Sequence, residues 1–172
     1  MVSDENLMLE FKRGSQEAFD ELFARYREPI YGFFRRRLPD RPRAEDLTQE
    51  TFLAMIRASA RYEPRSLVRT YLYGIALKLV AAERRKLARA HPSDAGETSD
   101  AGSMGETRDT ALWIRQALEK LDAAEREIVM LREYEQLSYQ EIAALLRLPL
   151  NTVRTRLYRA RLALKEQLHA TR

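Results

Sequence analysis

Residues 138–161 read SYQEIAALLRLPLNTVRTRLYRAR, and this stretch predicts two helices separated by a short turn. Ser138 followed by Glu141 is a capping box, in which the serine oxygen accepts from the Glu141 amide and the carboxylate reaches back to the serine amide. Leu137 and Ile142 occupy the positions of a hydrophobic staple around this helix start. The beginning of the first helix is therefore specified twice.

The second helix of this pair is expected to begin with Asn151 as its cap and to run to at least Arg161. The first helix must end near Pro149, because the residue before a proline is pushed out of the helical region. On the second helix the apolar positions Val153, Leu157 and Ala160 share the face that packs on the first helix. The residues available to a ligand are Asn151, Thr152, Arg154, Thr155, Tyr158 and Arg159, with Arg156 on the flank.

These exposed side chains suit DNA recognition. Arginine can bond a guanine edge with two hydrogen bonds or contact a phosphate, and hydroxyls can do either. The competing interpretation is a helical hairpin whose arginines form a solvated face. Residues 147–172 carry seven basic residues against the single acidic Glu166, whereas ordinary solvated faces mix their signs. The charge therefore favours a DNA-binding helix-turn-helix.

Charge divides the 172-residue chain into three blocks, although its net charge is only +4. Residues 1–90 hold 18 Lys and Arg against 13 Asp and Glu, residues 91–110 hold 1 against 5, and residues 111–172 hold 11 against 8. The middle block is rich in Gly, Ser, Thr and Asp, a composition that predicts an acidic flexible linker. The sequence thus predicts two small domains, residues 1–90 and 111–172, on either side of that linker.

Both domains are predicted to be helical. Apolar residues from Phe19 to Phe34 recur at steps of three and four, and Pro29 within that run predicts a kink or a break. Pro42 suits the first turn of a second helix that continues through about Ile56, with Phe52, Met55 and Ile56 able to face the core. A third apolar stripe follows, made of Val68, Leu72, Ile75 and Leu79. No strand alternation is visible, so we expect an all-α fold: an N-terminal bundle of three or four helices and a C-terminal four-helix domain with the helix-turn-helix.

Composition also excludes several classes of function. With 45% hydrophobic and 33% charged residues the chain is globular, and without cysteine it can form no disulfide or thiolate metal site. An acidic N-terminus argues against a signal peptide, and the sequence lacks a long apolar run that could insert into a membrane. The lack of cysteine fits a reducing compartment, so we expect a cytoplasmic protein. We also expect no catalytic residues, metal or cofactor, since His91 lies in the linker and His169 near the C-terminal end, and no histidine-centred site is evident.

Residues 121–164 resemble region four of the extracytoplasmic-function sigma factors, the group 4 members of the sigma-70 family. The N-terminal domain resembles region two of the same family through the stretches AEDLTQETF at residues 44–52 and YLYGIA at residues 71–76. Together the two matches cover almost the whole chain. The resemblance implies a subunit that directs bacterial RNA polymerase core to promoters and assists promoter melting.

The resemblance assigns a docking surface to the second helix. Asp46, Gln49, Glu50 and Leu53 lie at i, i+3, i+4 and i+7, so they form one stripe. In the family this region binds the coiled-coil clamp of the beta-prime subunit, and region four meets the beta flap. A solvated acidic turn that favours the helix dipole is the competing interpretation.

Promoter melting is assigned by the same resemblance to the segment around residues 61–71 and to the helix that follows it. Opening a duplex requires stacking partners for an extruded base and cations that guide the displaced strand. The candidates are Arg61, Tyr62, Arg65, Ser66, Arg69, Tyr71, Lys78, Arg84 and Arg85. Core packing is an equal alternative for Tyr71.

Four positions depart from the family pattern. Tyr71, Lys78 and Ala82 stand where tryptophan, asparagine and aspartate are usual, which implies an altered base preference at the minus-ten element. Arg147 replaces the usual glycine of the helix-turn-helix turn, where a left-handed conformation is often needed. We therefore expect strain or reshaping in that turn.

The resemblance extends to the linker and to the partners. The acidic linker corresponds to a family segment that enters the polymerase toward the RNA exit path, although it could equally be a plain tether. The resemblance also allows an anti-sigma factor as a partner. Two rivals are a response-regulator type of DNA-binding protein, which needs a parallel sheet before His91, and a nucleic-acid-modifying enzyme, which needs a catalytic cluster.

Overall fold

The computed structural model describes residues 1–90 and 106–170, which form helices and no strand. Two compact units are present, divided near residue 100. The first contains α1 (Asp4–Lys12), α2 (Gln16–Arg37), α3 (Arg41–Ala58), the short 3-10 helix η1 (Ser59–Arg61) and α4 (Val68–Ala90). The second contains α5 (Glu106–Glu119), α6 (Ala123–Glu133), α7 (Tyr139–Leu146) and α8 (Leu150–Ala170). The prediction of two small helical domains is confirmed, and the parallel sheet that a response-regulator type requires is absent from residues 1–90.

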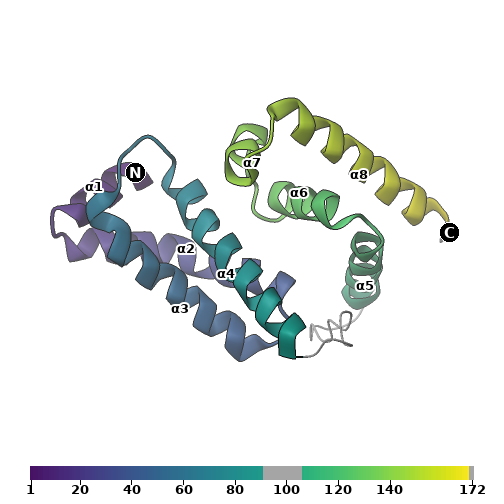
Figure 1. Ribbon diagram of the computed structural model, residues 1–172, viewed down its shortest axis with the longest axis horizontal. Helices are drawn as coiled ribbons and strands as arrows, with labels where there is room; N and C mark the ends of the chain where they lie inside the picture. The colour runs from purple at the N-terminus through teal and green to yellow at the C-terminus, as the bar shows by residue number, and fades with distance from the viewer. Residues whose placement is uncertain (91–105, 171–172) are drawn as a thin grey trace. The chain divides into compact units, whose positions relative to one another are not determined.

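The N-terminal domain is built from the three long helices α2, α3 and α4, with α1 packed beside the first half of α2 (Figure 1). Ser3, Ser15 and Asp40 cap the starts of α1, α2 and α3 with their side-chain oxygens. A row of aromatic rings connects the first three helices: Phe11 of α1 contacts Phe19 at 5.1 Å between ring centroids, and Phe23 contacts Phe52 of α3 at 4.8 Å. Aromatic packing therefore joins α1 to the core of the bundle.

Helix α2 passes through Pro29 without ending, so of the two predicted outcomes, a kink or a break, the break is wrong. Pro29 is exposed, whereas Tyr26, Ile30 and Phe33 on either side of it are buried. An interior proline costs a helix about 3 kcal/mol, and burying several large side chains recovers more than that. Pro42 lies in the first turn of α3, as predicted.

The buried faces differ in detail from the sequence pattern. In α4 the core side is centred on Val68, Leu72, Ala76 and Val80, while Ile75 and Leu79 are only half-buried. In α3, Phe52 and Met55 are buried as predicted, but Ile56 is 39% exposed. In α4 the buried face is shifted from the expected one toward Tyr73, which also packs inward with its ring 5.6 Å from that of Phe33.

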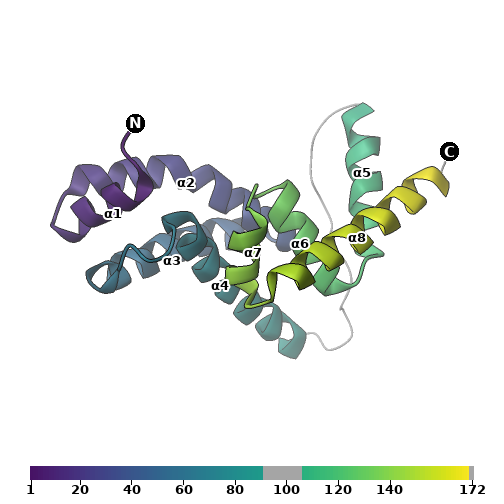
Figure 2. The ribbon, with the colours of Figure 1, turned by 90° about the horizontal axis from the view of Figure 1, so that it is seen from above.

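In the C-terminal domain α8 contacts each of α5, α6 and α7 (Figure 2). Residues 106–110, which composition assigned to the linker, are helical and form the beginning of α5. All five residues are polar, so composition could not distinguish the start of this helix from the linker. The rest of the predicted linker, residues 91–105, lies outside the described residues.

Candidate nucleic-acid interface

Helix α7 begins at the capping box that the sequence predicted. The Glu141 amide donates to Ser138 Oγ at 3.1 Å, and the Ser138 amide donates to the Glu141 carboxylate at 2.6 Å. Leu137 and Ile142 are fully buried, in agreement with the predicted hydrophobic staple. Both signals are local, so this helix start is specified by residues within about one turn of it.

The turn after α7 is a Schellman motif centred on Arg147. Its backbone is left-handed, with φ 54° and ψ 47°. The Leu148 amide donates to the Ala143 carbonyl at 3.0 Å and the Arg147 amide to the Ala144 carbonyl at 3.4 Å, which satisfies the last carbonyls of the helix. The turn therefore keeps the left-handed geometry that glycine would favour, and it is not reshaped.

Replacing Arg147 with glycine should stabilise the C-terminal domain by about 1 kcal/mol, because a left-handed backbone costs a residue with a Cβ roughly that much. The shift would be measured by urea unfolding followed through the fluorescence of Trp113, the single tryptophan of the chain, which lies in α5. Arg147→Ala is the matched control, since it removes the charge and retains the strain. An equal gain in both variants would attribute the effect to charge and contradict this explanation.

Helix α8 has a buried apolar face and an exposed polar face on the opposite side. Val153, Leu157 and Ala160 are fully buried, as predicted. The outward residues Asn151, Arg154, Thr155, Tyr158 and Arg159 are exposed, and Thr152 and Arg156 are half-buried at the edges. Tyr158 keeps 65% of its surface exposed. The candidate recognition residues therefore lie together on one accessible surface, which we call the α8 outer face.

Asn151 is not the cap that the sequence predicted, because α8 already begins at Leu150. The Thr152 and Val153 amides donate to the Pro149 carbonyl at 3.0 and 3.2 Å, so the first turn closes two residues earlier than predicted. The Asn151 carbonyl accepts from Thr155 Oγ1 at 2.9 Å. The Asn151 side chain, freed from capping, is available on the α8 outer face.

In the N-terminal domain the candidates for DNA melting lie in η1, in the segment that joins η1 to α4, residues 62–67, and along α4. Most of these candidates are exposed: Arg61, Arg65, Ser66, Lys78, Arg84 and Arg85. Two of them, Arg69 and Tyr71, are half-buried, and Tyr62 is buried. Arg65 pairs with Glu63 at 3.0 Å. Arg61 and Arg65 are therefore the exposed cations at the segment itself, whereas Lys78, Arg84 and Arg85 lie ten or more residues farther along α4.

Tyr62 lies in the core, with 4% of its surface exposed, which corrects its predicted role as a stacking partner. Its hydroxyl donates to the Ser66 carbonyl at 3.1 Å, across the segment. Burial, together with the charges of Glu5 and Asp4, raises the pKa of Tyr62, so the hydroxyl remains a donor. Tyr62 therefore supports the segment from inside.

Tyr71 is half-buried and packs edge-on against Tyr62, with 6.1 Å between ring centroids. Burial raises its pKa, and the neighbouring Arg61 guanidinium opposes that rise. Lys78 and Ala82 follow at i+7 and i+11, so these three departures from the family pattern share one side of α4. Tyr71 therefore fits both of its predicted roles: the packed part of its ring fits a role in the core, and the accessible part fits stacking on an extruded base.

The predicted docking stripe of α3 is accessible, but its carboxylates face a neighbour. Asp46, Gln49 and Leu53 are exposed and Glu50 is half-buried. Arg43 Nη1 lies 3.4 Å from Glu50 and 3.9 Å from Asp46, while its Nη2 lies 2.9 Å from Glu83 of α4. The sequence pattern did not single out Arg43, because nothing local indicates that an arginine of α3 meets Glu83, forty residues away.

The described residues offer no site of two other kinds. No group of three or more His, Asp or Glu side chains among them could hold a metal ion. None of the helices described is long and apolar enough to cross a membrane.

Comparisons with known proteins match both domains. The Sigma-70 region 2 model matches residues 22–90, and the Sigma-70 region 4 model matches residues 111–164. The chain is 32% identical to the RNA polymerase sigma-H factor of Pseudomonas aeruginosa, over 96% of this chain and 93% of that protein. It is 30% identical to the ECF RNA polymerase sigma-E factor of Escherichia coli K12, over 97% and 95% of the two chains. Among solved structures, CnrH in complex with the cytosolic domain of CnrY superimposes with a TM-score of 0.76 at 27% identity and covers 98% of this chain and 99% of that one.

The fold and the α8 outer face define a two-domain, all-helical protein with a helix-turn-helix. With these matches, the chain belongs to the sigma-70 family, in its extracytoplasmic-function group. Members of this family are transcription initiation factors that direct RNA polymerase to promoters, so the predicted family and general function are confirmed.

Proposed function

We propose that α8 recognises the minus-thirty-five element of the promoter through its outer face. The observation that carries this proposal is the division of α8, with its apolar residues fully buried and its arginines, tyrosine and threonine gathered on the opposite side. A helix of this kind fits the major groove, where arginine and hydroxyl groups distinguish base pairs. Residues 111–172 would be the domain that carries this role.

The N-terminal domain, residues 1–90, would bind core polymerase and melt the minus-ten element. The exposed cations Arg61, Arg65, Lys78, Arg84 and Arg85 suit guidance of a displaced strand, and the accessible part of Tyr71 suits stacking on a base. The beta-prime clamp helices would bind the α3 docking stripe, which consists of Asp46, Gln49, Glu50 and Leu53. The beta flap would bind the C-terminal domain. In that encounter arginines of the clamp would compete with Arg43 for the two carboxylates.

The proposal has three further parts. The acidic segment, residues 91–110, would enter the polymerase toward the RNA exit path. An anti-sigma factor would bind the chain, which is supported by the structure of the similar protein CnrH with the cytosolic domain of CnrY. The chain would act in the cytoplasm and would contribute no catalytic group, since nucleotide addition belongs to the polymerase.

Reconstitution with core RNA polymerase tests the proposal as a whole. The purified chain should co-elute with core and direct initiation from a subset of a randomised promoter library. If it bound no core and selected no promoter, the proposed function would be wrong.

Arg154→Ala and Arg159→Ala should each weaken binding to the minus-thirty-five element by about 1 to 3 kcal/mol if the arginine bonds a base with two hydrogen bonds. Binding would be titrated with duplexes selected from the library at several salt concentrations. Lys165→Ala is the control, because Lys165 is an exposed cation farther along α8 and outside the predicted contact residues. Unchanged affinity and salt dependence in both arginine variants would show that another face of α8 meets DNA.

A further inference from the structure

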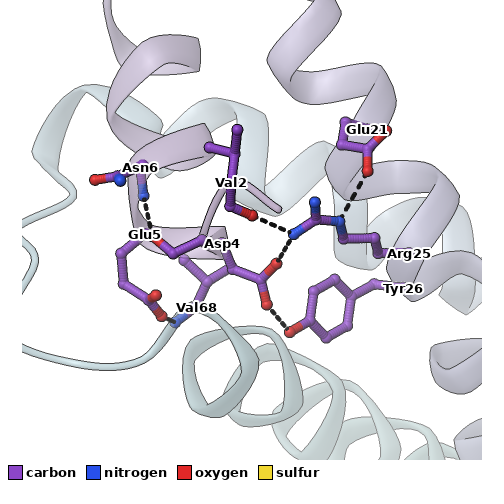
Figure 3. A network of polar contacts seen from close by, with 9 residues as sticks. Val2, Asp4, Glu5, Asn6, Glu21, Arg25, Tyr26 and Val68 are labelled. Atoms are coloured by element: carbon purple, nitrogen blue, oxygen red, sulfur yellow. Dashed lines mark hydrogen bonds and ion pairs between the residues drawn. The ribbon is translucent and has the colours of Figure 1, made fainter.

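Helix α1 contacts both ends of the segment at residues 62–67. Lys12 Nζ donates to the Tyr62 carbonyl at 2.9 Å, where the segment begins. The Val68 amide donates to Glu5 Oε1 at 3.1 Å, where the segment ends and α4 starts (Figure 3). Glu5 and Lys12 are seven residues apart, two helical turns, so one face of α1 supplies both contacts.

Each contact has a physical reason. The Val68 amide is in the first turn of α4, where backbone amides have no hydrogen-bond partner within the helix. The Glu5 carboxylate accepts its hydrogen bond and interacts favourably with the positive end of the helix dipole. Tyr62 and Val68 are both buried, with 4% and 0% of their surfaces exposed. The hydrogen bond from Tyr62 to the Ser66 carbonyl adds a third connection inside the segment. The path of the backbone between η1 and α4 is therefore fixed by α1 as well as by its own residues.

The position of α1 is set by a separate group of contacts. The Asp4 carboxylate accepts from Arg25 at 2.7 Å and from the Tyr26 hydroxyl, and Arg25 also bonds Glu21 at 2.9 Å (Figure 3). Burial and the hydrogen bond to Asp4 hold the pKa of Tyr26 well above its ordinary value, so its hydroxyl stays protonated. Leu7 and Met8 of α1 are buried as well. Changes at Glu5 or Lys12 should therefore leave α1 docked.

We propose that Glu5 and Lys12 are positioning residues, which hold the segment at residues 62–67 in the conformation that receives the displaced minus-ten strand. This inference rests on the proposed role of that segment in melting. A segment held in place before binding loses less conformational freedom when the strand arrives, so its cations engage more tightly. Both positioning residues lie before the stretch that matches Sigma-70 region 2, residues 22–90.

The first test examines the free chain. In Glu5→Ala and Lys12→Met, trypsin should cleave after Arg65 about fivefold faster, the factor that corresponds to one lost hydrogen bond. The thermal midpoint should fall by no more than about 4 to 8 °C, the shift that one lost hydrogen bond causes in a domain of this size. Glu10→Ala and Arg13→Met are matched controls, because they remove exposed charges of the same sign from α1 and its C-terminal end. Equal cleavage rates in all five proteins would overturn the inference.

The second test uses the holoenzyme reconstituted with core polymerase. Affinity for a single-stranded minus-ten oligonucleotide should fall about fivefold in Glu5→Ala and in Lys12→Met, again the factor that corresponds to one lost hydrogen bond. Affinity for a minus-thirty-five duplex should not change, whereas a general loss of structure would lower both. Glu5→Gln and Lys12→Arg, which keep an acceptor and a donor, should restore most of the binding.

A variant that removes one cation in the segment and one directly before it separates the two proposals. If Arg61→Ala with Arg65→Ala leaves the minus-ten affinity unchanged, the proposed function of the segment fails. If that variant weakens binding and the two α1 variants do not, only the role of Glu5 and Lys12 is overturned.

Discussion

Arg43→Met should destabilise the N-terminal domain by about 3 kcal/mol, the cost of leaving one member of a buried ion pair without its partner. Arg43 Nη2 lies 2.9 Å from Glu83, whose side chain is only 8% exposed. This hydrogen bond raises the pKa of the Arg43 guanidinium above its already high ordinary value, so the arginine is charged at every physiological pH. The variant would leave the Glu83 carboxylate facing the core from α4.

The double variant Arg43→Met with Glu83→Leu is the control for this prediction. It removes both charges and fills the space with apolar atoms, so its stability should return to within about 1 kcal/mol of the parent chain. Urea unfolding followed by circular dichroism would report both domains, and Trp113 fluorescence would report the C-terminal domain alone. If the double variant were as unstable as Arg43→Met, the loss would come from packing around Arg43 and not from the unpaired carboxylate.

Arg43 also connects the stability of this domain to its proposed docking surface. The same guanidinium faces Glu50 and Asp46 of the α3 stripe at 3.4 and 3.9 Å. Removing Arg43 should therefore leave these carboxylates more available to cations of a partner. Arg43→Met would lower stability without weakening the docking stripe itself.

Leu157→Ala should destabilise the C-terminal domain by about 3 kcal/mol, since it opens a cavity among fully buried side chains. Leu157 lies on the inner face of α8, which packs against α6 and α7. A domain of this size has only a few kcal/mol of stability in total, so a large part of its population would unfold at 37 °C. Minus-thirty-five binding should fall in proportion, although every residue of the α8 outer face is intact.

The matched control is Leu162→Ala, the same substitution on the same helix at a residue that is 42% exposed. Its effect should stay within about 0.5 kcal/mol. Trp113 fluorescence during urea unfolding would measure both variants, and DNA titration at 15 °C should recover part of the binding of Leu157→Ala. If the two leucine variants behaved alike, the packing of α8 would not depend on its inner face.

Local signals in the sequence predicted much of the fold and of the C-terminal site. The capping box at Ser138 and the spacing of Val153, Leu157 and Ala160 act within one or two helical turns, so they could be recognised without the rest of the chain. The left-handed conformation at Arg147 was predicted from the family resemblance, because glycine is usual at that place in the turn. The cap expected at Asn151 was wrong, because the Pro149 carbonyl already closes the first turn two residues earlier.

By itself, the sequence determined the helical class, the two domains and the face that α8 presents, since these depend on hydrophobic period, caps and charge along one helix. Only the tertiary structure showed that Pro29 is accommodated in α2, that Tyr62 is buried, and that Arg43 meets Glu83. It also brought Glu5 and Lys12 to the segment at residues 62–67, fifty or more residues away. Such contacts depend on how whole helices pack against one another, and no pattern within a single helix encodes that arrangement.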